Sequence, residues 1–262
     1  MASSTPNSQR PLLVLDQVGK NFRGAGGSVM AAVKGVSLTV HAGEIVALVG
    51  ESGSGKSTLG RIALGLLQPD AGSVTFDGHR LTGLSPEEFR KLRTGMQPIF
   101  QDPTASLNPR KTVRELLMQA LWTQPGEGEA RCARLLEDVG LRPAARYLDR
   151  YPHELSGGQR QRVSIARSLA MEPKLIIADE PLSGADVSIR GQVLNLLLDI
   201  QRSRDVAYLM ITHDISIARA FADRVAVMMK GELVEVGPAD TVLREPGHAY
   251  TRRLVAAVPA LD

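Results

Sequence analysis

The chain has 262 residues, of which 43% are hydrophobic and 23% are charged, with a net charge of +3. This composition is typical of a soluble globular protein with one large domain, and the charge is too small to indicate nucleic-acid binding. The apolar runs at 45–50 and 175–178 are far shorter than the roughly 20 residues of a membrane helix. Cys132 is the sole cysteine, which excludes an internal disulfide or an iron–sulfur cluster and fits a reducing compartment.

The first third of the chain is rich in signals for β-strands, several of them antiparallel. Residues 1–10 are polar and are expected to form a flexible tail without a signal peptide. Runs of β-branched and apolar residues bounded by glycine turns predict strands over 11–22, 33–40, 45–50 and 72–81.

The middle of the chain predicts a helical insertion, and the last third returns to alternating strands and helices. Ser85-Pro86 followed by two glutamates is a helix start, and no convincing strand occurs between Leu107 and Gly158. The other predicted helices cover 112–122, 128–141, 189–201, 215–224 and 247–259. Buried strands are predicted over 174–180 and 207–214, and 225–237 predicts a hairpin that turns at Gly231.

The stretch "GESGSGKST" fits the phosphate-loop pattern G-x-x-x-x-G-K-[ST], with a predicted strand before it and an amphipathic helix after it. Glycines let the backbone N–H groups surround a phosphate, and the helix N-terminus adds about half a positive charge. Lys56 supplies a full charge for the β- and γ-phosphates, and the Ser57 hydroxyl is a ligand for Mg²⁺. The predicted ATP-binding residues of this loop are Gly50, Glu51, Ser52, Gly53, Ser54, Gly55, Lys56, Ser57 and Thr58.

Polar side chains follow other predicted strands at the edge where α/β folds bind ligands. Asp179 is expected to hold Mg²⁺, and Glu180, on the opposite side of its strand, to polarise the attacking water. His213 is expected to hydrogen-bond the γ-phosphate and to hold Glu180 and the water in place. Gln101, after the apolar run "PIF", can reach Mg²⁺ or the water. Lys56, Glu180 and His213 are therefore the predicted catalytic residues, and Ser57, Gln101 and Asp179 the predicted metal ligands.

A second glycine turn, "LSGGQ", occurs about a hundred residues after the phosphate loop. It comprises Leu155, Ser156, Gly157, Gly158 and Gln159 and begins a predicted basic helix. Its N–H groups and helix dipole favour a phosphate, although a plain helix cap would have the same residues.

The order of these motifs, from the phosphate loop through Gln101, "LSGGQ" and "LIIADE" to His213, resembles the ATPase subunit of an ATP-binding cassette transporter. The resemblance covers about 12–258. It implies an α/β P-loop NTPase core with a parallel sheet at about 11–101 and 168–245, and an antiparallel β subdomain. A helical subdomain at about 102–167 and a short tail at 245–262 complete this single domain, 11–262.

The same resemblance implies that two subunits pack head to tail, so that the "LSGGQ" turn of each contacts the ATP of the other. It also implies that Phe22 stacks on adenine and that Ser183 and Asp186 lie at the dimer contact. The family's usual Ser-Ala-Leu-Asp reads Ser-Gly-Ala-Asp here. Loss of a buried leucine side chain would cost on the order of 1–3 kcal/mol, so we expect a looser contact between the subunits.

Three stretches, beginning at Ile99, Asp179 and Gly247, resemble ATPase subunits of bacterial dipeptide, oligopeptide and nickel importers. The resemblance implies ATP and Mg²⁺ as cofactors and a peripheral position on the cytoplasmic face of the inner membrane. The implied partners are a second, sister ATPase subunit, two transmembrane permeases and, indirectly, an extracytoplasmic solute-binding protein, with no nucleic acid. The choice between peptide and nickel chelate stays open, as does the choice between homodimer and heterodimer.

Three other classes of protein share some of these motifs. A soluble cassette ATPase of a non-transport complex, such as phosphonate degradation, can have a similar tail and stays open as the alternative. A small-molecule kinase has no use for "LSGGQ", and a DNA-repair cassette protein would carry a long coiled-coil insertion that this sequence lacks.

Overall fold

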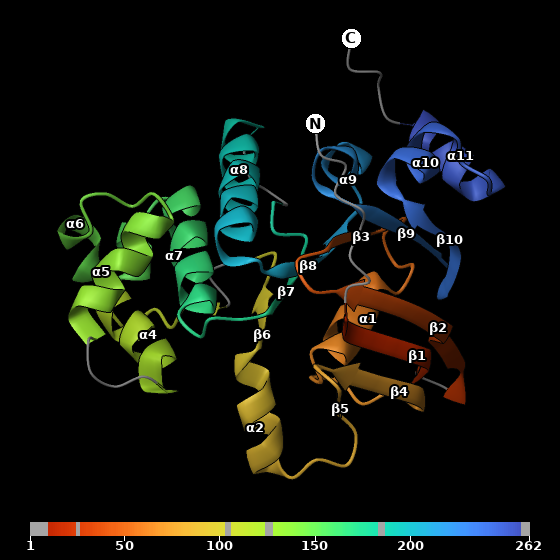
Figure 1. Cartoon of the computed structure of the whole chain (residues 1–262), viewed down its shortest axis with the longest axis horizontal. Helices are drawn as coiled ribbons and strands as arrows, with labels where there is room; N and C mark the ends of the chain where they lie inside the picture. Colours follow the sequence, from red (N-terminus) through yellow and green to blue (C-terminus); the bar gives the residue numbers. More distant parts are fainter. Residues whose placement is uncertain (1–9, 25–26, 103–105, 124–127, 183–186, 258–262) are drawn as a thin grey trace.

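The structure is a computed structural model that describes residues 10–24, 27–102, 106–123, 128–182 and 187–257. Most of the predicted tail 1–10 lies outside the described residues, as do Ser183 and Asp186. In Figure 1 a group of helices lies on one side of the molecule and two sheets lie on the other.

The first sheet is antiparallel and has the strand order β2-β1-β4-β5. Its strands are β1 (Pro11–Arg23), β2 (Val29–His41), β4 (Ala71–Phe76) and β5 (His79–Arg80). Along β1 the side chains of Leu13 and Leu15 are buried while Asp16 is exposed. This alternation is typical of an antiparallel sheet with one face on the core and one in solvent.

The second sheet has the strand order β10-β9-β3-β8-β7-β6. Its strands are β3 (Ile45–Val49), β6 (Met96–Ile99), β7 (Leu175–Asp179), β8 (Ala207–Thr212), β9 (Arg224–Met229) and β10 (Glu232–Pro238). All neighbours are parallel except β9 and β10. β3 and β8 are buried along their whole length because other elements cover both faces of the sheet.

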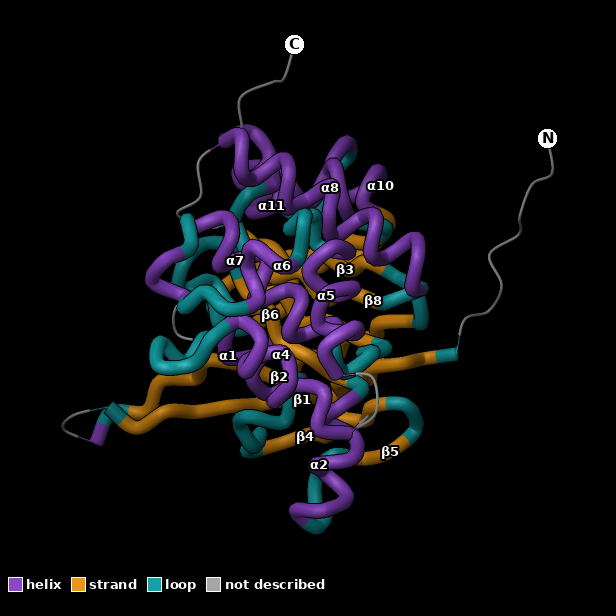
Figure 2. The backbone as a smooth tube through the Cα atoms, turned by 90° about the vertical axis from the view of Figure 1, so that its left-hand side faces the viewer, coloured by secondary structure: helices purple, strands orange, loops and turns teal. Residues whose placement is uncertain are grey.

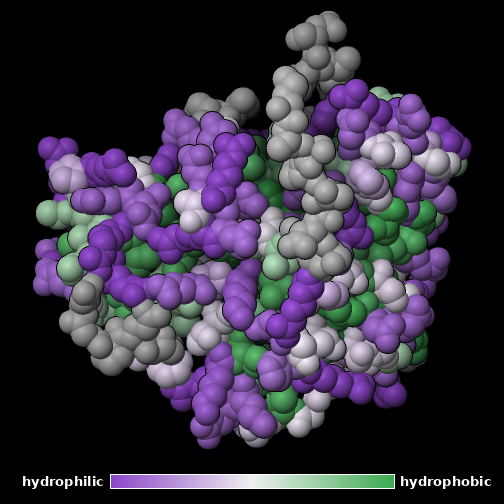
Figure 3. Space-filling model, in the orientation of Figure 1, coloured by the Kyte–Doolittle hydropathy of each residue, from purple (hydrophilic) through white to green (hydrophobic). Residues whose placement is uncertain are grey.

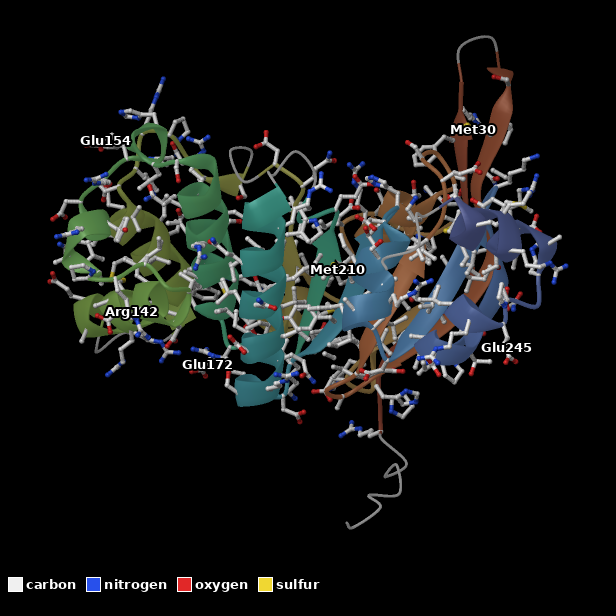
Figure 4. All side chains as sticks on the ribbon, turned by 90° about the horizontal axis from the view of Figure 1, so that it is seen from above. Met30, Arg142, Glu154, Glu172, Met210 and Glu245 are labelled. Carbon is white, nitrogen blue, oxygen red and sulfur yellow. The ribbon has the colours of Figure 1, made fainter. Side chains whose placement is uncertain are left out.

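The two faces of the parallel sheet pack against different partners. Leu209 and Ile211 share an apolar cluster with the antiparallel sheet and with α1 (Lys56–Ala63). Tyr208 and Met210, whose side chains alternate with these, belong to the cluster that includes α8 (Val187–Arg204). Met210 is labelled beside α8 in Figure 4. The parallel sheet, whose strand β3 leads into the phosphate loop, is therefore packed against other elements on both faces.

The chain between β6 and β7 forms the helical lobe. Its elements are α4 (Val113–Ala120), η2 (Leu121–Thr123), α5 (Gly128–Asp138), α6 (Ala145–Leu148), η3 (Pro152–Glu154) and α7 (Gly157–Leu169). Thr112 and Ser156 begin α4 and α7 with capping boxes, in which each hydroxyl accepts a backbone N–H three residues on. Leu116, Leu135 and Val163 bury the apolar faces of α4, α5 and α7 against one another. Figures 1 and 2 show the lobe as a layer of helices beside the parallel sheet.

The remaining helices are α2 (Pro86–Thr94), α9 (Ile215–Phe221), α10 (Ala239–Arg244) and α11 (Ala249–Ala256). The sequence did not predict α10, which packs Val242 and Leu243 against Val225 and Val227 of β9. Polar side chains cover most of the face seen in Figure 3, with smaller apolar patches between them. Among the described residues, no helix combines the length and the apolar character needed to cross a membrane.

Candidate functional site

The phosphate loop lies between β3 and α1, as the motif predicts. Gly55, the N-cap of α1, has a φ of 105°, and a Cβ there would lie 2.2 Å from the carbonyl oxygen of Ala32. Only glycine fits this left-handed position beside a neighbouring backbone. No side chain among the described residues caps α1, so the N–H groups of its first turn face the loop without an intrahelical acceptor. The arrangement suits an anion.

The Lys56 side chain is buried and folds back over the loop. Its Nζ donates hydrogen bonds to the carbonyl oxygens of Gly50 and Glu51, each at 2.8 Å. Burial lowers the pKa of Lys56, and the nearby carboxylates of Glu180 and Asp179 oppose that shift. Lys56 therefore holds a donor group inside the loop, within reach of a bound phosphate.

Asp179 and Glu180 diverge at the end of β7. The Ser57 hydroxyl donates to Asp179 Oδ1 at 3.0 Å. Burial raises the pKa of Asp179, the bond from Ser57 counteracts it, and the charge of Glu180 adds to it. A hydroxyl and a carboxylate side by side next to a phosphate loop are the hard oxygen donors that suit Mg²⁺. The described residues contain no group of three or more His, Cys, Asp or Glu side chains placed to bind a metal. Mg²⁺ is commonly bound by one or two carboxylates together with substrate phosphates.

Glu180 turns toward the end of the neighbouring strand β8. Its φ is 46°, an uncommon value for a residue with a side chain, and its N–H donates to the carbonyl oxygen of Ile211 at 2.9 Å. His213 Nδ1 lies 3.1 Å from Glu180 Oε1, with the histidine side chain 60% exposed and the glutamate 22% exposed. The carboxyl ends of two parallel strands thus bring together an acid and an imidazole that lie far apart in sequence.

A cavity of about 640 Å³ extends from the phosphate loop to the β1–β2 hairpin. Its lining combines predicted residues with others that sequence reasoning missed: Phe22, Val29, Met30, Ala31, Ala32, Lys34, Ser52, Gly53, Gly55, Lys56, Ser57, Thr58, Glu180, Lys230 and Gly231. Figure 4 shows Met30 near the tip of the hairpin. Phe22 is 38% exposed, so its ring is accessible to a ligand at the outer end of this cavity.

Five of the missed residues belong to β2, and the other two, Lys230 and Gly231, form the β9–β10 turn. Gly231 donates its N–H to the carbonyl oxygen of Ser54 at 2.9 Å and accepts the N–H of Lys34 at 2.8 Å. The turn is therefore bonded to both the phosphate loop and β2. The sequence predicted Gly231 at a hairpin turn. Its position beside the phosphate loop depends on the order of the strands in the sheet, which the sequence alone did not show.

The "LSGGQ" turn lies in the helical lobe, at the start of α7. Leu155 is buried and anchors the turn, whereas Ser156 and Gly157 are exposed. Ser156 Oγ accepts the N–H of Gln159 at 3.3 Å, and Gln159 Oε1 accepts the N–H of Ser156 at 3.0 Å. Figure 1 shows α7 and α1 on opposite sides of α8 and β7. The structure thus brings the phosphate loop, Asp179, Glu180 and His213 together, but leaves this turn on a separate surface.

The structure gives less information on Gln101 and on the predicted subunit-contact residues Ser183 and Asp186. Gln101 follows β6, next to β7 at the edge of the parallel sheet, and is exposed. Its predicted contact with Mg²⁺ or water stays a prediction. Ser183 and Asp186 were expected at a subunit contact, and both lie outside the described residues.

Comparison with known proteins gives one consistent result. The family model described as "ABC transporter" matches residues 33–183. The chain is 52% identical over 235 residues to the glutathione import ATP-binding protein GsiA of Escherichia coli strain K12 and of Salmonella paratyphi A. These alignments cover 88% of this chain and 37% of each relative, so the chain spans well under half the length of the curated proteins it matches.

Solved structures agree with the sequence match. CbiO1 of Clostridium perfringens, part of the ABC transporter complex cbiONQ, is 31% identical with a TM-score of 0.78, covering 90% of this chain and 91% of that one. The ATP-binding cassette MJ0796, solved as a dimer in a post-hydrolysis state with ADP and phosphate, has the same identity and TM-score. That match covers 87% of this chain and 99% of the cassette.

Proposed function

Because the chain belongs to the ABC transporter family, we propose that it is the ATP-binding and ATP-hydrolysing subunit of a bacterial importer. The observation that carries the proposal is the pair of contacts at one sheet edge beside the phosphate loop. Ser57 bonds Asp179, and His213 contacts Glu180. Ser57 and Asp179 provide ligands for a metal ion, and Glu180 provides a base. ATP hydrolysis requires both.

The proposed chemistry assigns a task to each side chain. Lys56 and the N–H groups at the start of α1 bind the phosphates of ATP. Ser57 and Asp179 hold Mg²⁺, which when bound supplies positive charge against the phosphate oxygens. With its proton on Nδ1, His213 donates to Glu180 Oε1 and fixes the direction of that carboxylate. Glu180 then orients the attacking water and accepts its proton. Phe22 stacks on the adenine ring.

The exposed "LSGGQ" turn supports assembly with a second ATPase subunit, in which each turn completes the other subunit's nucleotide site. Ser156 is already held by its capping box, and Gly157 offers backbone without a side chain in the way. Gly158 follows inside the first turn of the same helix. Their N–H groups and the positive end of α7 suit the γ-phosphate of an opposing ATP.

A groove beside the helical lobe supports docking to permeases. This cavity of about 430 Å³ is lined by Leu66, Arg93, Gln97, Pro98, Phe100, Ser106, Ala120, Ser164, Arg167, Ser168 and Met171. The segment after β6 contributes Phe100 and Ser106 to this lining. Arg167 donates to the carbonyl oxygen of Ser106 at 2.8 Å, which ties α7 to that segment. We propose that a cytoplasmic helix of a permease fills the groove and places the subunit on the cytoplasmic face of the membrane.

The solute is proposed from the relatives. Their name describes glutathione import, so a short peptide is favoured over a nickel chelate, and transport is favoured over a soluble complex. Specificity is assigned to the permeases and the solute-binding protein. Reconstituted vesicles should show ATPase activity that rises with binding protein loaded with a short peptide, and nickel-loaded binding protein should give no rise. A rise with nickel-loaded binding protein and none with peptide-loaded binding protein would instead assign a nickel chelate as the solute.

The catalytic assignment is tested with Glu180→Gln in the assembled complex. The amide cannot accept the proton, so turnover should fall by about 10²- to 10⁴-fold while ATP still binds. Glu245→Gln, an exposed glutamate at the end of α10, is the matched control and should hydrolyse ATP normally. Normal hydrolysis by the Glu180 variant would overturn the role of this carboxylate.

The shared-site assignment is tested with Ser156→Arg and Lys56→Ala. In the isolated subunit, Lys56→Ala should lose ATP affinity and Ser156→Arg should keep it, because its turn serves the other subunit. In the assembled complex both should lose ATPase activity. If Ser156→Arg weakened ATP binding by the isolated monomer, the turn would belong to its own chain's site.

A further inference from the structure

The geometry points to Tyr250 as a positioning residue for the phosphate loop, acting from the last described helix, α11. Tyr250 Oη accepts a hydrogen bond from the backbone N–H of Glu51 at 3.0 Å. Glu51 is the second residue of the loop, and the two partners are 199 positions apart in the chain. The tail helix therefore contacts the loop that the proposed function assigns to ATP.

The ring of Tyr250 is fixed by its surroundings. Only 4% of the residue is exposed, and it packs in one apolar cluster with Ala47 and Val49 of β3 and with Val227 of β9. The guanidinium of Arg253 lies 5.9 Å from the ring centroid. A ring held by the strand that leads into the loop can keep its hydroxyl in place with little loss of side-chain freedom.

The helix that carries Tyr250 is anchored separately. Glu235 of β10 accepts the backbone N–H of Gly247 at 2.7 Å and that of His248 at 3.1 Å. His248 Nδ1 in turn accepts the N–H of Tyr250 at 3.1 Å and caps α11. One carboxylate thus orients the first residues of the tail, and the tail orients the tyrosine.

The bond from Tyr250 and the bonds from Lys56 use different backbone atoms of the loop. The tyrosine bond uses the N–H of Glu51, while the carbonyl oxygens of Gly50 and Glu51 accept Lys56 Nζ. The Tyr250 hydroxyl of the tail therefore holds the N–H of Glu51, and Lys56 holds the carbonyl oxygens of Gly50 and Glu51. Without the tyrosine hydroxyl, the Glu51 N–H loses its acceptor and the loop is less well ordered before ATP binds, which weakens binding.

The test rests on the proposed function and uses Tyr250→Phe, which keeps the ring and removes the hydroxyl. ATP affinity of the subunit, and KM for ATP in the assembled complex, should weaken by about three- to tenfold, the value of one hydrogen bond. The turnover number at saturating ATP should stay near that of wild type, because Glu180 and His213 are untouched. Amide hydrogen exchange at Glu51 should become faster in the variant.

Tyr208→Phe is the matched control. Tyr208 is buried in β8, and within the described chain its hydroxyl has no hydrogen-bond partner, so its removal should leave KM unchanged. If wild type binds ATP and Lys56→Ala binds it more weakly, the ATP-binding part of the proposed function stands. Under that result, a Tyr250→Phe variant with wild-type KM and wild-type exchange at Glu51 would overturn the positioning role alone. Failure of wild type to bind ATP would refute the proposed function itself.

Discussion

Gly157→Ala separates the two interpretations of the "LSGGQ" turn, a helix cap or half of a nucleotide site. Gly157 is the first residue of α7 and is exposed, and apart from its chain neighbours and its own helix backbone no described atom lies within 4 Å of the position where a Cβ would lie. Alanine is favoured over glycine in a helix by about 0.5–1 kcal/mol, with the lower value at a helix end. For a chain of this size the melting temperature should rise by about 1–3 °C.

The same methyl group should damage the assembled enzyme. In the proposed assembly the space beside Gly157 holds the γ-phosphate of the second subunit's ATP. An added Cβ would push that phosphate out of place, and ATPase activity should fall by about a hundredfold. The variant is thus expected to be more stable and less active.

Two measurements decide the outcome, thermal unfolding of the isolated subunit and ATP turnover of the complex. The control is Gly191→Ala in α8, another exposed helical glycine, where apart from its chain neighbours and its own helix backbone no described atom lies within 4 Å of the added Cβ. It should give the same stabilisation with normal turnover. A Gly157→Ala complex that hydrolysed ATP at the wild-type rate would refute the shared site and leave the turn as a cap.

Three further predictions concern the chain's own nucleotide site. Lys56→Ala should weaken ATP binding by about 10- to 100-fold in calorimetry, and equal affinity would contradict its phosphate role. Asp179→Asn should lose Mg²⁺-dependent turnover yet match or exceed wild-type stability at pH 7 in urea, because burial raises the pKa of this carboxyl and folding opposes its charge. That stability difference should shrink as pH falls toward the ordinary aspartate value of 3.8. Phe22→Ala should weaken binding of ATP by about 5- to 100-fold but leave inorganic triphosphate unchanged, whereas Phe22→Tyr should bind both normally.

The sequence predicted the elements well where hydrophobic periodicity was long and glycine or capping residues marked the ends. The strand before the phosphate loop, the helical segment between Leu107 and Gly158, and the hairpin at Gly231 all have such signals. The P-loop NTPase fold with a parallel sheet and an antiparallel subdomain is confirmed. Short elements were harder. β6 spans four residues and was seen only as an apolar run, and α10 spans six, too few for a helical period to show.

The sequence predicted the chemical roles of site residues more easily than it predicted which residues contact the phosphate loop. A motif identifies Lys56 and Ser57, and strand ends identify Asp179, Glu180 and His213. The presence of Lys34, Lys230 and Tyr250 near the loop depends on which strands are neighbours and on where the tail packs. Neither depends on local residue spacing, so single-sequence reasoning had no signal for these three residues.

The strand order has a consequence for how the chain is made. β3 leads into the phosphate loop, yet both of its neighbours in the sheet, β8 and β9, come from the last quarter of the chain. A growing polypeptide that has already left the ribosome as far as α7 still lacks the strands that flank β3. Its nucleotide pocket closes only near the end of synthesis, so partly made chains should neither bind ATP nor compete with finished subunits for a place in the proposed assembly.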